Sequence, residues 1–270
     1  MPWVTRGLRN GVLTTRYPKR PDGYGANWRG AVSVRPDGAG RPAVTDGLCP
    51  TGAIRPGATS HGRAGGPAGG PVLDRGKCIL CGRCVAERPD VFSFDSSAEV
   101  AALTRPGLVV PPPEESEAAL AAVRAELSRR VAALRKSVHV RHVDAGSDGS
   151  EEWEVAALLG PVYDVHRLGV FFTASPRHAD LLLVTGAGCP GMAGPLLTTY
   201  EAMPDPRVVV AVGTDAISGG IVRSGDTGPG GVGEIVPVDV WVPGSPPSPF
   251  SVLHGILLAV GLLPAKRGPA

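Results

Sequence analysis

The residues with the clearest chemical potential are four cysteines in the first third of the chain. Cys78, Cys81 and Cys84 are separated from one another by two residues each, and Cys49 lies upstream, directly before a proline. Four thiolates held together bind either an iron–sulfur cluster or a zinc ion. We therefore expect Cys49, Cys78, Cys81 and Cys84 to be the ligands of one metal centre.

The spacing favours an iron–sulfur cluster. In bacterial two-cluster ferredoxins, each C-x2-C-x2-C-x3-C-P run gives three cysteines to one cluster and its fourth to the other. Here the second run has Arg88 in place of its fourth cysteine, and the first run keeps only Cys49. The other three positions of the first run are Ala39, Pro42 and Thr45. Because the four retained cysteines all belong to one cluster, we predict a single [4Fe–4S] site.

Two alternatives to the cluster stay open. Four cysteines also form a tetrahedral zinc site, and a degenerate site would bind no metal. The C-x2-C-x2-C run with a remote Cys-Pro is the ferredoxin arrangement, which favours the cluster. In such a site the thiolates hold the iron, and backbone N–H groups turned toward the sulfurs tune the reduction potential.

The composition indicates a folded chain of one or two domains, since 43% of its 270 residues are hydrophobic. The 27 basic and 25 acidic residues leave a net charge of +2, which gives no reason to expect nucleic acid as a partner. No apolar run approaches the roughly 20 residues that cross a bilayer, and the first residues lack a secretory apolar core. We expect a cytosolic chain, in which cysteines are ligands or free thiols rather than disulfides.

The elements that must position the site differ between the two halves of the chain. Residues 1–110 are rich in Gly, Pro and Arg, and an amphipathic helix is expected from about Glu114 to Lys136. Beyond it, continuous apolar runs alternate with Gly-rich turns and helical stretches, which favours a parallel α/β sheet. The expected strands are Val138–Val143, Leu181–Thr185, Val208–Val212 and Ile235–Val242, and the expected helices are Met192–Met203 and Ser251–Leu263. We predict a ferredoxin-like [4Fe–4S] domain over 1–110, a linker helix over 111–136 and an α/β domain over 137–265.

Residues 1–95 resemble the ferredoxin-like subunits of formate hydrogenlyase and related group 4 hydrogenases. The stretch from Arg6 to Pro18 (RGLRNGVLTTRYP) is typical of that family. The resemblance implies a small α+β ferredoxin-like domain.

Residues 137–263 resemble the small subunit of those hydrogenases and the 20 kDa, cluster-bearing subunit of complex I. The stretches that carry the resemblance are His142–Ser147, Ser175–Gly186, Thr199–Pro206, Gly233–Val240 and His254–Leu258. The resemblance implies a flavodoxin-like fold, and the chain is similar to a fusion of two neighbouring subunits. In such families a series of clusters passes electrons to a large subunit.

The second half departs from that family where its proximal cluster binds. The resemblance places the four cluster cysteines at Asp148, Glu151, Asp215 and Ser245, none of which is cysteine here. Carboxylates and a hydroxyl are poor ligands for iron–sulfur clusters, although they suit Mg²⁺ or Ca²⁺. We expect a lost cluster whose cavity is filled by polar, solvated residues, and we do not assign these four as metal ligands.

Four other residues are given structural roles. Cys189 follows an expected strand and is interpreted as a free thiol, although it lies close to the same loops. Arg177 and His178 precede the same strand and are expected to cap it or to contact another subunit, and His254 is expected to pack against the sheet.

The resemblance implies an electron-transfer and docking subunit of a membrane-associated complex like energy-converting hydrogenase or NADH-quinone oxidoreductase. The expected partners are a large subunit, membrane subunits and a redox partner protein, with the chain peripheral on the inner face of the membrane and inactive alone. The alternative is a scaffold subunit whose α/β domain conducts no electrons. A free-standing α/β enzyme is disfavoured, because no nucleophile–base pair or phosphate loop is evident.

Overall fold

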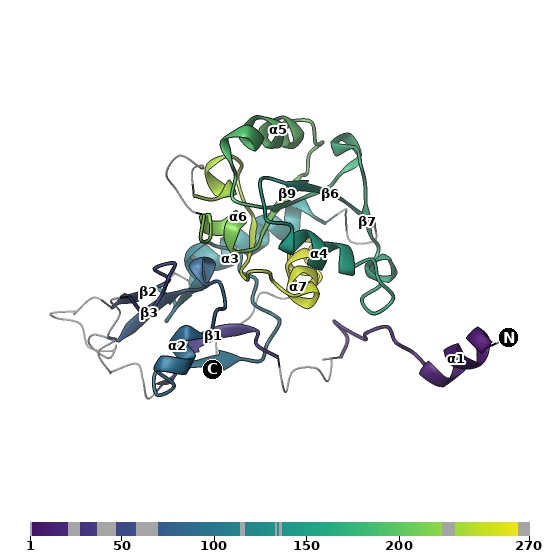
Figure 1. Cartoon of the computed structure of the whole chain (residues 1–270). Helices are drawn as coiled ribbons and strands as arrows, with labels where there is room; N and C mark the ends of the chain where they lie inside the picture. The colour runs from purple at the N-terminus through teal and green to yellow at the C-terminus, as the bar shows by residue number, and fades with distance from the viewer. Residues whose placement is uncertain are drawn as a thin grey trace.

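The structure is a computed structural model, and the residues it describes are 2–20, 28–36, 47–57, 70–113, 117–132, 134, 137–222 and 230–263. Its larger part is an α/β unit with two smaller antiparallel sheets at one side (Figure 1).

The α/β unit is built on a five-stranded sheet in which every neighbouring pair is parallel. Its strands are β6 (Val138–Asp144), β7 (Val170–Phe172), β8 (Leu181–Thr185), β9 (Val208–Val212) and β10 (Val240–Val242). The spatial order β10-β9-β8-β6-β7 is the flavodoxin-like doubly wound order, so the predicted fold class is confirmed. Strands β8 and β9 are buried at every position, which explains their continuous apolar sequences.

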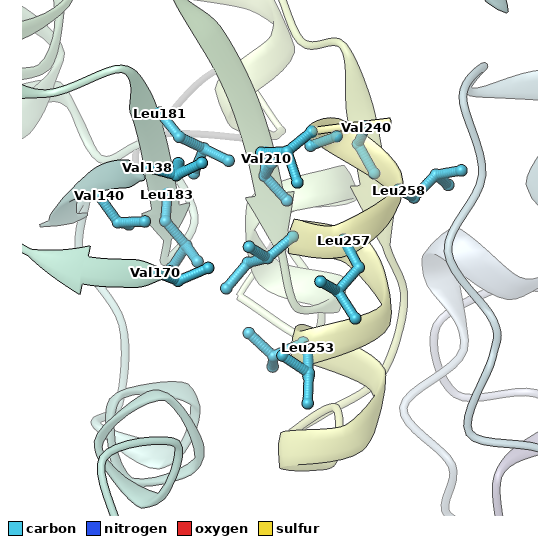
Figure 2. Packing of buried hydrophobic residues seen from close by; sticks show 14 of the residues in the cluster. Val138, Val140, Val170, Leu181, Leu183, Val210, Val240, Leu253, Leu257 and Leu258 are labelled. Atoms are coloured by element: carbon cyan, nitrogen blue, oxygen red, sulfur yellow. The ribbon is translucent and has the colours of Figure 1, made fainter. Parts of the chain in front are cut away.

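Helices cover both faces of this sheet. One face packs against α7 (Pro249–Ala259), α4 (Ser150–Ala157) and α3 (Glu117–Arg130), and the other packs against α5 (Pro190–Glu201) and α6 (Thr214–Ser218). Figure 2 shows Leu253 and Leu257 of α7 beside Val210 and Leu183 of the sheet. Alternate residues of each strand enter the two cores, as the pleat requires.

Several element boundaries differ from those expected. The last strand begins at Val240 rather than Ile235, because Val232–Glu234 form a 3-10 turn and Pro237 has no N–H to donate. The edge strand β7 was not predicted, since it has three residues and no clear period. Helix α7 ends at Ala259 rather than Leu263, just before Gly261 with its left-handed φ of 70°. The helix expected from Glu114 to Lys136 is seen as α3, which ends at Arg130; residues 131, 132 and 134 form turns, and residues 114–116, 133 and 135–136 lie outside the described residues.

The front part is a small α+β arrangement, as expected. Strand β1 (Ala31–Val34) pairs antiparallel with β4 (Phe92–Asp95), and β2 (Ile54–Pro56), β3 (Pro71–Asp74) and β5 (Val109–Val110) form a second antiparallel sheet. A short helix, α2 (Arg83–Glu87), follows the second sheet's middle strand. These elements enclose a third, separate core, which includes Cys78 and Cys84.

The N-terminal segment is attached to the α/β unit. Helix α1 (Pro2–Asn10) extends away from the rest of the chain and buries none of its residues (Figure 1). After it, the Thr15 N–H donates to the Val162 carbonyl at 2.7 Å, and the ring of Tyr17 packs edge-on against Phe250. Among the described helices, none has the length and apolar character needed to cross a bilayer.

The central strand gives a direct test of this core. Leu183 is fully buried between β6 and β9, so Leu183→Ala leaves a cavity and is expected to cost about 2–5 kcal/mol of unfolding free energy. Leu197→Ala, in α5 and 41% exposed, is the matched control and should change stability by about 0.5 kcal/mol or less. Urea denaturation of both variants measures the difference. Equal losses would show that β8 is not the centre of the core.

Candidate functional site

The structure brings the four predicted cysteines to one pocket in the front core. Cys49 comes from the turn before β2, and Cys78, Cys81 and Cys84 come from the loop that leads into α2 and from its first turn. The remaining walls are mainly apolar and are formed by Val32, Leu48, Pro50, Ala53, Ile54, Leu73, Ile79 and Gly82. Cys49 thus meets three cysteines that lie at least 29 positions later in the sequence, as the ferredoxin pattern predicts.

The loop between Cys78 and Cys84 has two residues in the left-handed region. Leu80 has φ 55° and Gly82 has φ 75°, and a leucine in this region is uncommon. A side chain at Gly82 would also approach the Phe94 ring to 3.3 Å. Such a backbone turns N–H groups toward the interior of the loop, where they can face sulfur atoms.

Backbone and side-chain groups contact the sulfur of Cys49. The Ala53 N–H donates to Cys49 Sγ at 3.2 Å, and Thr51 Oγ1 lies 3.4 Å from the same sulfur. The Thr51 hydroxyl also donates to the Lys77 carbonyl at 2.6 Å, next to Cys78. Thr51 therefore ties the segment of Cys49 to the loop of the other three cysteines, a role that we did not predict.

The thiols differ in their ionisation. Burial raises the pKa of Cys78 to about 12 and of Cys84 to about 11, and the charges of the neighbouring thiols contribute in both cases. Burial acts in the same direction on Cys49, but its contacts with Thr51 and with backbone N–H groups outweigh it and lower its pKa. Without a cation, Cys78 and Cys84 are thus neutral near pH 7, and a metal centre would supply the positive charge that favours thiolates.

The donor set fits an iron–sulfur cluster. Four thiols, N–H groups near sulfur and apolar walls are what such a site requires. No group of three or more His, Cys, Asp or Glu that could hold a metal ion occurs in the described part of the chain. Ligands of a single zinc ion lie about 3.8 Å apart, because Zn–S bonds measure about 2.3 Å in a tetrahedron. Cluster cysteines bind separate irons and stand farther apart than the ligands of one zinc ion.

The cysteine loop is seated on the α/β unit. The Thr214 hydroxyl donates to the Cys78 carbonyl at 2.9 Å in a fully buried bond. The 3-10 turn before Cys78 packs against α6, and a Cβ at Gly76 would lie 2.8 Å from Ile217 Cγ2. Beside this contact, Arg105 donates two hydrogen bonds of 2.8 Å to Asp74. The loop therefore meets the sheet at its carboxyl edge, where Thr214 follows β9.

The four polar replacements lie in loops and first helical turns at that same edge. Asp148 and Glu151 follow β6, Asp215 follows β9, and Ser245 follows β10. The expectation that they are solvated is wrong for Glu151, whose side chain is 0% exposed. Its Oε2 accepts from the Ser150 hydroxyl at 3.1 Å, whereas Oε1 has no hydrogen-bond partner. Burial first, and then the charge of Asp215, raise the pKa of Glu151 to about 7.

The remaining candidates occupy unremarkable positions. Cys189 is a half-buried free thiol whose Sγ would lie 2.7 Å from a Cβ at Gly146. Arg177 and His178 are exposed in a 3-10 turn before β8. His254 is buried in α7, and its Nδ1 accepts from the Ala101 N–H at 3.3 Å.

A polar network near the ends of β6 and β8 was not predicted. Glu152 accepts hydrogen bonds from Ser147, at 2.7 Å, and from Thr185, whose hydroxyl lies 3.0 Å from His142 Nε2. In the sequence, the only indication of this network is that polar residues stand at the ends of the apolar strand runs.

Comparison with known proteins supports both halves of this description. Residues 149–259 match the family described as NADH ubiquinone oxidoreductase, 20 Kd subunit, and residues 72–125 match a 4Fe-4S single cluster domain. The probable membrane-bound hydrogenase subunit mbhJ of Pyrococcus furiosus is 40% identical over 141 residues, which are 51% of this chain and 84% of that protein. The chain belongs to the NADH ubiquinone oxidoreductase 20 kDa subunit family.

Two further relatives of this 20 kDa subunit family bear on function. Formate hydrogenlyase subunit 7 of Escherichia coli is 39% identical over 163 residues, and the match covers 59% of this chain and 63% of that protein. NAD(P)H-quinone oxidoreductase subunit K of Picosynechococcus is 43% identical over 105 residues, 38% of this chain and 43% of that protein. The chain therefore spans less than two thirds of either relative. The 4Fe–4S domain match includes Cys78, Cys81 and Cys84, while Cys49 lies upstream of it.

The bond between Thr214 and Cys78 can be tested by substitution. Thr214→Val keeps the shape but leaves the buried Cys78 carbonyl without its donor, so it should cost about 1–3 kcal/mol of unfolding free energy. Thr199→Val removes an exposed hydroxyl bond to the Pro195 carbonyl and serves as the control, with a loss of about 0.5 kcal/mol or less. Urea denaturation measures both. Indistinguishable variants would contradict a structural role for this bond.

Proposed function

We propose that this chain is an electron-transfer and docking subunit of a membrane-associated complex of the hydrogenase or NADH-quinone oxidoreductase kind. It carries one [4Fe–4S] cluster, which when bound accepts and releases one electron at a time. Cys49, Cys78, Cys81 and Cys84 hold the cluster. The observation that carries the proposal is the convergence of these four thiols, from two distant segments, on one apolar pocket.

The residues around the pocket have defined roles in this proposal. The N–H group of Ala53 stabilises the charge on Cys49, and the apolar walls keep water from the buried Cys78 and Cys84. Cys81 is exposed and so marks the side on which a redox partner would approach.

A single cluster is favoured by what occupies the other ligand positions. Arg88, at the fourth position of the second run, pairs with Asp90 at 3.0 Å instead of facing a metal. Positions 39, 42 and 45 of the first run lie outside the described residues, but none of them is a cysteine.

We infer the docking role from the kinds of complex that the names of the relatives describe. Those relatives are subunits of formate hydrogenlyase, of a membrane-bound hydrogenase and of NAD(P)H-quinone oxidoreductase. We propose that residues 1–110 form the cluster domain, 111–136 the linker, and 137–265 the domain that docks a large subunit. Helix α1 supports contact with another surface, because Trp3 and Leu8 are 73% and 80% exposed. The chain would thereby lie peripherally on the inner face of the membrane through partner subunits.

One observation favours the scaffold alternative. The loops at the carboxyl edge hold Asp148, Glu151, Asp215 and Ser245 where the resemblance places a second set of cysteines. Electrons leaving the proposed cluster would therefore cross a longer gap to a large subunit. In a scaffold subunit, the α/β unit would position the large subunit without conducting electrons to it.

The cluster is tested by metal analysis. The purified chain, reconstituted with iron and sulfide, should hold about four irons and give an EPR signal on reduction. Cys81→Ser should lose the signal or most of the iron, because it removes one ligand thiolate. Cys189→Ser replaces the one cysteine outside the pocket and is the matched control, with iron content unchanged. Bound zinc in place of iron, or equal behaviour of the two variants, would contradict the assignment.

Electron transfer and scaffolding are separated by turnover of the assembled complex. If electrons pass through the cluster, Cys81→Ser should reduce turnover at least about tenfold while the complex still assembles, as a barrier increase of about 1.4 kcal/mol would do. Size-exclusion chromatography checks assembly, and Cys189→Ser again is the control. Full turnover in an intact Cys81→Ser complex would support the scaffold.

A further inference from the structure

The buried carboxyl of Glu151 has no role in the proposed electron transfer. It lies in the first turn of α4, at the carboxyl edge of the sheet, and is 0% exposed. One oxygen accepts from Ser150, and the other has no hydrogen-bond partner. A buried carboxylate in this condition is much less stable than the neutral acid, so the group favours binding a proton.

The packing around this carboxyl is tight and specific. A Cβ at Gly213 would lie 2.6 Å from Glu151 Oε1, so the unpartnered oxygen rests directly on the backbone before α6. Gly213 has φ 95°, which adds a second reason for glycine there. The site therefore depends on a glycine that leaves room for the carboxyl.

The charged groups that act on Glu151 are themselves acidic. They are Asp215, in the first turn of α6, and Asp148, in the loop before α4. Helix α7, which packs against α4, contributes no charged residue, and its one histidine, His254, is engaged with the Ala101 N–H. On α4 itself, Glu152 is held by Ser147 and Thr185 and raises the pKa of Asp215, after burial and Asp148.

Two neighbouring carboxyls in a poorly solvated site do not readily both ionise, because each charge disfavours the other. Burial and then Asp215 raise the pKa of Glu151 to about 7, and burial raises that of Asp215. Asp148 is exposed and Asp215 is partly exposed, so a proton can reach Glu151 from solvent through them.

The same loop connects Glu151 to the cysteine pocket. Gly213 contacts the carboxyl, and the next residue, Thr214, donates to the Cys78 carbonyl at 2.9 Å. Since consecutive Cα atoms are 3.8 Å apart, the carboxyl and the Cys78 carbonyl lie within roughly 15 Å of each other. An electron added beyond the Cys78 carbonyl is somewhat farther away, and in a protein interior it would change the pKa by up to about one unit.

We propose that Glu151, with Asp215 as its acidic neighbour, is a proton-binding site linked to the oxidation state of the adjacent cluster. This linkage rests on the proposed function. The redox partner protein delivers one electron to the cluster, and the Glu151 carboxylate takes one proton from water, which restores the local charge. On oxidation, the electron passes to the acceptor protein and the proton returns to water.

The proton site is tested first, without reference to the cluster. Infrared spectra of the full chain should contain a carboxylic-acid C=O band that disappears as the pH rises through about 7. The band should be missing in Glu151→Gln and retained in Glu201→Gln, an exposed glutamate at the end of α5. Asp215→Asn removes the acidic neighbour and should move the loss of the band to lower pH. A spectrum of the wild type identical to that of Glu151→Gln would overturn the site.

The linkage is tested in the reconstituted chain by EPR-monitored redox titration from about pH 6 to about pH 9. The reduction potential of the wild type should fall as the pH rises above about 7, because the reduced state binds the proton more tightly. Glu151→Gln should flatten this dependence, and Glu201→Gln should keep it. A flat wild-type curve with a normal cluster overturns the linkage and leaves the proposed function intact. A reconstituted chain without iron overturns both the linkage and the proposed function. The infrared band still shows whether Glu151 binds a proton.

Discussion

The contact between the cysteine loop and α6 joins the front part of the chain to the α/β unit. A hydroxyl at Thr214 and a glycine at Gly76 let the loop carrying Cys78 lie directly on the sheet's carboxyl edge. The Asp74–Arg105 ion pair and the bridge between Ala102 and Trp241 are further interactions of the same region of the chain. Because the contact is buried and close, a shift of the loop would disturb the thiols and the sheet edge together. The two parts are therefore joined by direct packing at this edge.

The cysteine pocket and the site of Glu151 share one property, which is that ionisable groups are buried there without counter-ions. In the pocket, Cys78 and Cys84 are neutral as free thiols, and a cluster would supply positive charge that favours thiolates. At Glu151 no cation acts on the carboxyl through the interactions described, so a proton is the simplest compensating charge. In both places, burying an uncompensated negative charge is unfavourable. A metal centre would compensate it in the pocket, and a proton would compensate it at Glu151. The difference follows from the ligand atoms, because sulfur binds iron well and carboxylate oxygen binds protons well.

Much of the fold could be predicted because its strands are buried on both faces. The runs Leu181–Thr185 and Val208–Val212 are continuous and apolar, and both strands have the bounds that the sequence indicated. The edge strand Val170–Phe172 could not be found, since a strand of three residues is defined by its partner rather than by its own pattern. The start of β10 was misplaced because an apolar run around Pro237 looks like a strand, although proline cannot donate to the ladder.

The parts of the candidate site that follow from short-range sequence spacing could be predicted, and the parts formed by distant residues could not. Cysteine spacing identified the four thiols that line the pocket, because ferredoxin-type ligands follow fixed intervals. Thr51 and Thr214 could not be identified, since a threonine that bonds a distant carbonyl has no sequence pattern. Glu151 was expected to be one of the solvated residues that fill the cavity of a lost cluster. It is buried instead, and Gly213, a residue 62 positions later, leaves space for its carboxyl. Its burial is therefore a property of the assembled sheet edge, and any change at Gly213 acts on Glu151 and on the Cys78 contact at once.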